Sequence, residues 1–120
     1  MQMGIDPYLV ARLSGHVEER LLFLFYDCDG AFRSEWGLTG SLSSVAVLRA
    51  ELARAAVRSE ARYAVMAHNH PSGAAGPSPQ DIMSTRHVYR LFAALDVTLT
   101  DHVIVASDGL AFSFRLAGLV

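Results

Sequence analysis

Two histidines and an aspartate lie close together in the sequence in a pattern that could hold a metal ion. His68 and His70 follow the apolar residues 63–67, and Asp81 comes after a short loop. In an extended chain this spacing puts both imidazoles on the same side. Two imidazoles and one carboxylate leave a fourth tetrahedral position open, which is typical of a catalytic zinc site, although other divalent ions also accept these ligands. We therefore expect one Zn²⁺ ion here.

Such a site indicates hydrolysis. A zinc ion lowers the pKa of a bound water from about 15.7 to about 7 and polarises a carbonyl oxygen. The reaction also needs a general base and a donor for the developing oxyanion. Ser78, one helical turn before Asp81, is placed for the donor role. The motif holds no base, so we look for it among upstream carboxylates.

Each of these residues also has a plainer interpretation. Residues 78–81, Ser-Pro-Gln-Asp, form an ordinary helix N-terminus, with Ser78 as the cap and Pro79 at the first helical position. A His-x-His pair alone is a weak signal. Only the combination of a buried strand, two histidines on one side, a Gly/Pro loop and a carboxylate at a helix start favours a metal site.

The elements that must position these side chains follow from the hydrophobic pattern. Short apolar runs bounded by turn residues predict strands. They cover residues 21–26, 31–38, 63–67, 97–100, 102–106 and 110–114. Apolar residues at helical spacing and capping residues predict helices over 7–13, 44–58 (capped by Ser44) and 78–95. This mixture is typical of an α/β or α+β domain, with one sheet and helices packed on it.

The composition narrows the classes of protein. The 120 residues suit one domain, and 52% hydrophobic against 18% charged residues is enough for a core. A net charge of −2 gives no overall electrostatic reason to bind nucleic acid. The single cysteine, Cys28, excludes an internal disulfide. The sequence has no recognisable signal peptide and no apolar run that could span a bilayer, so we expect a cytoplasmic protein without membrane contact.

The motif residues resemble a known family. The pattern His68-x-His70-Pro71, six residues, then Ser78-x-x-Asp81 is similar to the JAMM (MPN+) metalloprotease signature. The fuller strings at 68–73 (His-Asn-His-Pro-Ser-Gly), at 77–85 with Thr85, and at 100–105 (Thr-Asp-His-Val-Ile-Val) resemble the RadC branch of that superfamily. The resemblance runs from about Glu18 to Val120.

The resemblance implies a fold and a set of roles. The fold is α/β, a cytidine-deaminase-like mixed β-sheet sandwiched by helices, with residues 1–120 forming a single RadC-like JAB/JAMM domain that has no helix-hairpin-helix region. Zinc is held by His68, His70 and Asp81, and Ser78 is the transition-state donor. The family's catalytic glutamate falls on Glu19. The adjacent Glu18 is the alternative, because neighbouring strand residues face opposite ways and only one can point at the metal.

The sequence departs from the family pattern in two places. Residues 48–51, Leu-Arg-Ala-Glu, stand where the family often has His-Pro-Arg-Glu, so a role for that histidine and arginine does not carry over. Asn69 replaces the Ser or Thr common in deubiquitinating members, so ubiquitin cleavage is not implied.

Asp101 and His102 come next to each other. His102 could orient a ligand, but we expect the pair to be structural, tying a strand end to a helix.

Three functions are compatible with these residues. The first is a zinc-dependent hydrolase of metallopeptidase type, in which Glu19 activates the water that attacks an amide or peptide bond. The second is a JAMM-like binding module without catalysis. The third is a RadC-type accessory to DNA repair, although the charge makes nucleic-acid binding by this domain alone unexpected. The sequence leaves open which peptide or protein is the substrate, and whether the chain forms a homodimer.

Overall fold

A single five-stranded sheet organises the chain. The computed structural model describes residues 4–40, 48–71 and 73–120. Its elements, in chain order, are α1 (Pro7–Leu13), β1 (Arg20–Tyr26), β2 (Phe32–Thr39), α2 (Arg49–Arg58), β3 (Tyr63–His70), α3 (Pro79–Ala93), β4 (Thr98–Ala106) and β5 (Ala111–Ser113). Ser44, the predicted cap of the second helix, lies outside the described residues. No helix in the described ranges has the length and apolar character needed to cross a membrane.

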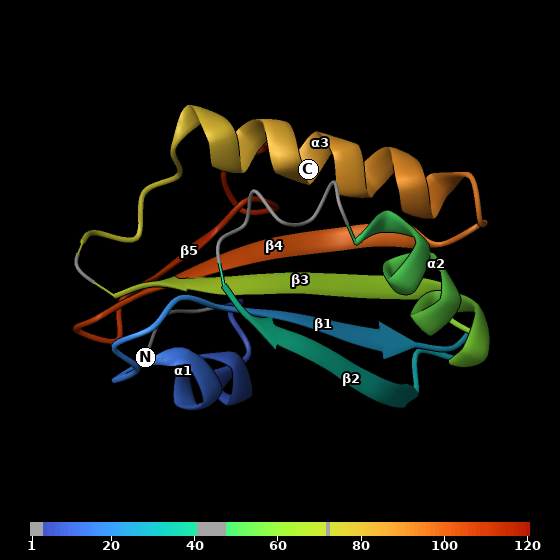
Figure 1. Ribbon diagram of the computed structural model, residues 1–120, viewed down its shortest axis with the longest axis horizontal. Helices are drawn as coiled ribbons and strands as arrows, with labels where there is room; N and C mark the ends of the chain where they lie inside the picture. Colours follow the sequence, from blue (N-terminus) through green and yellow to red (C-terminus); the bar gives the residue numbers. More distant parts are fainter. Residues whose placement is uncertain (1–3, 41–47, 72) are drawn as a thin grey trace.

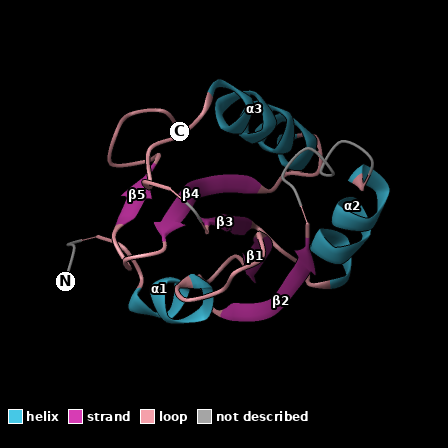
Figure 2. Cartoon of the chain, turned by 60° about the vertical axis from the view of Figure 1, so that its left-hand side comes forward, coloured by secondary structure: helices cyan, strands magenta, loops and turns pink. Residues whose placement is uncertain are grey.

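The sheet is mixed, as expected for the α/β class. Its strand order is β2-β1-β3-β4-β5. β1 runs antiparallel to β2 and β3, β3 runs parallel to β4, and β4 is antiparallel to β5. A parallel pair needs a crossover connection, and α3 supplies it between β3 and β4. Helices α2 and α3 lie on one side of the sheet and α1 on the other (Figures 1 and 2).

Both faces of the sheet are buried, which explains the unbroken apolar run in β1. Leu21, Phe23 and Phe25 pack with side chains from α2 and α3. Leu22 and Leu24, which alternate with them, pack with α1. The central strands β1 and β3 therefore carry a core on each side, and the C-terminal end of β3 lies between the two helical layers.

The structure corrects one prediction about the strands. Residues 97–100 and 102–106 were predicted as two strands, but they form the single strand β4. The parallel register shifts within it, because Ala64 pairs with Leu99 while Val65 pairs with Asp101. Thr100 is the extra residue of this bulge, and a bulge reverses which side the following residues face. Leu99 therefore packs on the α2/α3 side, whereas Val103 packs on the α1 side.

Helix α1 is held to the edge strand by a polar cluster. Arg12 Nη2 donates to Glu35 Oε2 at 2.6 Å, and the Tyr8 hydroxyl donates to Glu35 Oε1 at 2.6 Å. Partial burial alone would raise the pKa of Glu35, but the hydrogen bonds from Arg12 and Tyr8 lower it overall. The carboxylate of Glu35 thus helps to keep α1 against the sheet.

Replacing Glu35 by Gln should lower stability at neutral pH and have little effect in acid. A carboxyl group whose pKa is lowered by folding stabilises the protein above its ordinary pKa, and this contribution disappears as the pH falls through the folded-state value. Because the pair is partly exposed, we expect a loss below about 1 kcal/mol at pH 7. Urea unfolding of both proteins from pH 3 to pH 7 measures it, and a difference that grows toward acid would contradict the assignment.

Candidate metal centre

Strand β3 delivers two imidazoles to the same face of the sheet. His68 and His70 are two residues apart at its C-terminal end, so their side chains point the same way. His68 is completely buried, whereas the side chain of His70 is 24% exposed. Their ring Nε2 atoms lie 3.0 Å apart. The site is therefore closed around His68 and open toward His70.

Helix α3 brings the carboxylate, and its N-terminal capping fixes the orientation of that carboxylate. Ser78 is the N-cap and forms a capping box with Asp81. The Ser78 N–H donates to Asp81 Oδ2 at 2.8 Å, and the Asp81 N–H donates to Ser78 Oγ at 3.0 Å. The predicted helix start is therefore present, and it contributes to the site as well as to the helix.

Asp81 is held in its charged form. Burial alone would raise the pKa of this carboxyl group, but the adjacent His68 imidazole and the hydrogen bond from the Ser78 backbone N–H lower it well below its ordinary value. A deprotonated carboxylate is the form that binds a cation.

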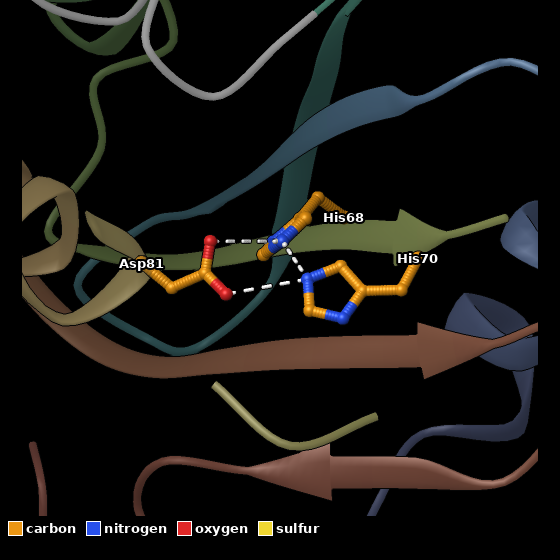
Figure 3. Close-up of side chains that lie close together, drawn as sticks. All are labelled: His68, His70 and Asp81. Atoms are coloured by element: carbon orange, nitrogen blue, oxygen red, sulfur yellow. Dashed lines mark hydrogen bonds and ion pairs between the residues drawn. The ribbon is translucent and has the colours of Figure 1, made fainter. Parts of the chain in front are cut away.

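The three side chains converge at distances that suit a small cation. His68 Nε2 lies 3.4 Å from Asp81 Oδ1, and His70 Nε2 lies 3.2 Å from Asp81 Oδ2 (Figure 3). Ligand atoms about 2.0–2.1 Å from one tetrahedral zinc ion would lie about 3.3–3.4 Å from each other. Taking one atom from each residue, all three lie within 4.8 Å of one another. These three residues could therefore hold one ion together.

Each of the two histidines makes a hydrogen bond through its Nδ1 atom, and this leaves its Nε2 atom able to bind a metal. A carbonyl oxygen only accepts, so His70 Nδ1 must donate to the Ala74 carbonyl at 2.9 Å. In the neutral ring this leaves the lone pair on Nε2. Metal-binding histidines usually donate their other ring N–H in this way, which fixes the tautomer and the ring orientation.

His68 obtains the same tautomer through a chain of three hydrogen bonds. Thr85 Oγ1 donates to the Asp81 carbonyl at 2.6 Å, so it must accept from His102 Nδ1, also at 2.6 Å. His102 Nε2 is then left to accept from His68 Nδ1 at 2.7 Å. The chain begins at one ligand, His68, and ends on the backbone of another, Asp81.

His102 is suited to this place because it stays neutral. It is completely buried, and that burial, with the neighbouring His68, lowers its pKa well below the ordinary value. Its ring stacks on Phe114, with centroids 4.6 Å apart. The bulge at Thr100 turns His102 to the side of the ligands, and without this shift in register His102 would face α1.

Asp101 and His102 have separate partners. We expected this pair to be structural and to tie a strand end to a helix. His102 does bind Thr85 of α3, but it also binds the ligand His68. Asp101 faces the other side, where it accepts from Ser113 Oγ at 2.7 Å and from the Arg115 N–H at 3.0 Å. Both residues lie in the interior of β4 rather than at a strand end.

Of the two predicted catalytic residues, only Ser78 lies in direct contact with a ligand, Asp81. Within the described residues, no hydrogen bond or ion pair joins the Glu19 carboxylate to the three ligands. Its position is nevertheless informative, because Leu21 pairs with His68 in the antiparallel register and Glu19 comes two residues earlier. Glu19 directly precedes β1, and the alternation of that strand, continued back from Leu21, would give Glu19 the side on which Leu21 and His68 lie. Glu18 is exposed, whereas Glu19 is half-buried.

The comparisons with known proteins show the family of the chain. The RadC-like JAB domain family matches residues 4–119. The chain belongs to this family. A UPF0758 protein of Paraburkholderia xenovorans is 35% identical over 116 residues, which are 96% of this chain and 46% of that protein. UPF0758 proteins of Dechloromonas aromatica and of a Marinomonas species are 35% and 37% identical over 117 residues, 97% of this chain and 52% of theirs.

This RadC-like JAB domain spans about half the length of these relatives. Their shared name states no activity. The domain itself therefore has an assigned family, an α/β fold and a His-His-Asp group that could hold a metal ion.

Replacing His102 by Phe should weaken metal binding while preserving the fold. Phe keeps the ring stacked on Phe114 but cannot accept from His68 Nδ1, so the tautomer of His68 is no longer fixed. Losing such a partner typically costs about 10–100-fold in metal affinity. Competition titration with a zinc chelator measures the affinity. His87→Phe, at an exposed position of α3, is the matched control, and equal affinities of the two variants would contradict the role of His102.

Proposed function

We propose that this domain is a zinc-dependent hydrolase that cleaves an amide or peptide bond. The observation that carries the proposal is the convergence of His68 Nε2 and His70 Nε2 on the Asp81 carboxylate, with both Nδ1 atoms already occupied as donors. A donor set of two imidazoles and one carboxylate with an open side is the set found in catalytic rather than structural zinc sites.

Zinc, when bound, supplies a more acidic water molecule and a polarised carbonyl group. The protein must supply the base, and we assign this role to Glu19. Support comes from the alternation of β1, which, continued back from Leu21 to Glu19, would turn Glu19 toward the ligands, and from the half-buried position of Glu19. The Glu19 carboxylate would take a proton from water and then pass it to the leaving amine.

Ser78 would stabilise the oxyanion. Its Oγ already accepts a hydrogen bond from the Asp81 N–H as the helix cap. This contact does not use the hydroxyl proton, so the O–H remains available to donate. Ser78 is also exposed, and the neighbouring His70 is partly exposed, so a substrate carbonyl can approach from this side. A hydroxyl placed where negative charge develops is the kind of donor that lowers the barrier of acyl transfer.

Metal analysis of protein purified without a metal-affinity step tests the proposal. We expect about one zinc per chain under zinc-replete conditions, and a loss of affinity greater than about 100-fold in His68→Ala and Asp81→Ala, because even partners of ligands contribute 10–100-fold. His87→Ala, which removes an exposed histidine of α3, should keep the metal. Wild-type protein without stoichiometric metal would overturn the proposal.

Catalysis is tested separately with a peptide library digested by the zinc-loaded protein and read by mass spectrometry. We expect cleavage products that disappear in Glu19→Gln and after chelation, and that return when zinc is added. A Glu19→Gln variant that binds zinc normally but cleaves nothing would support the role of the base. Zinc binding without any cleavage by the wild type would instead favour a binding module.

A further inference from the structure

Asn69, between the two histidines, makes contacts that the proposed chemistry has not used. Its side chain points away from His68 and His70, and the residue is only 2% exposed. The side-chain oxygen accepts from the Arg20 N–H at 2.6 Å, and the side-chain nitrogen donates to the Glu18 carbonyl at 3.0 Å. Both partners are backbone groups of the segment that enters β1.

These two backbone groups flank Glu19. In an extended chain, the carbonyl of residue 18 and the N–H of residue 20 point to the same side, and the polar groups of residue 19 point to the other. On that other side, the Glu19 carbonyl accepts from the Gly40 N–H at 2.9 Å. The backbone of Glu19 is therefore held from both sides, by the Asn69 amide and by the residue that comes directly after β2.

The Asn69 amide replaces a missing strand partner. The paired register of β1 with β3 ends at Leu21 and His68, so Glu19 lies beyond the ladder. Through its oxygen and one of its N–H groups, the Asn69 amide accepts and donates as a peptide group does, and it extends the pairing past Glu19. With the backbone kept extended, the Glu19 side chain must leave on the same face as Leu21 and His68, where the ligands converge.

We propose that Asn69 is a positioning residue, whose amide holds the backbone on either side of Glu19 and so directs the Glu19 carboxylate at the metal centre. The inference rests on the proposed role of Glu19. It explains why one chain segment carries two ligands and, between them, a buried amide. Ala at this position would supply neither contact, and Asp would supply the acceptor but not the donor.

Hydrogen exchange tests the backbone contact. In Asn69→Ala the Arg20 N–H loses its acceptor, so we expect exchange in residues 17–21 to become about tenfold faster. Asn69→Asp keeps an acceptor for the Arg20 N–H and should show a smaller increase, which provides a second variant if Asn69→Ala does not fold. Ser59→Ala removes a side-chain contact to the Ala55 carbonyl at the end of α2 and should leave this segment unchanged.

The visible absorption spectrum of the cobalt-loaded protein tests the effect on Glu19. We expect Glu19→Gln to alter the bands, Asn69→Ala to alter them in the same direction, and the double variant to change no more than Glu19→Gln alone, because the two residues then act as one unit. Cobalt affinity should stay within about threefold of wild type in Asn69→Ala, since the amide contacts none of the ligands.

Two results separate the inference from the function on which it rests. If Glu19→Gln leaves the cobalt spectrum unchanged, the assignment of Glu19 as the base is wrong. If Glu19→Gln alters the spectrum while Asn69→Ala or Asn69→Asp keeps the wild-type bands, the base assignment stands and the positioning role of Asn69 is overturned. An unchanged hydrogen-exchange rate of residues 17–21 in Asn69→Ala would also overturn the positioning role of Asn69.

Discussion

The hydrogen-bond chain from His68 through His102 and Thr85 to the Asp81 carbonyl is the constraint on which the candidate metal centre depends. It joins three elements, β3, β4 and α3, each of which contributes one or two members. Because a carbonyl can only accept, the direction of every donor in the chain is determined, and the lone pair of His68 Nε2 is left for a metal. Burial of His102 keeps that arrangement in its neutral form.

Other residues around the site also serve the fold and the candidate metal centre together. Asp81 completes the capping box of α3 and presents its carboxylate to both histidines. Ser78 caps the helix with its oxygen and retains a hydroxyl proton. Asn69 belongs to β3 but binds the chain that leads into β1. Helix capping, strand pairing and ligand orientation are thus carried by the same few side chains, so a change in one of them should disturb both structure and chemistry.

Much of this domain could be predicted from its sequence, because local patterns determine local structure. The unbroken apolar run of β1 and the serine cap of α3 predicted a buried strand and a helix start. Histidines two residues apart on a strand necessarily share a face, so His68 and His70 were predictable as a pair. The motif spacing indicated Asp81 as the third ligand, and the structure places all three together.

Only the tertiary structure could decide the rest, because it depends on residues far apart in the chain. His102 reaches His68 from 34 residues away, and only because a bulge at Thr100 reverses the alternation of β4. No pattern in residues 97–106 reveals that shift, since it exists only relative to β3. Asn69 reaches Glu18 across 51 residues. The sequence by itself determined which side chains could bind a metal, whereas the packing of β4 and β1 against β3 decided which groups orient them.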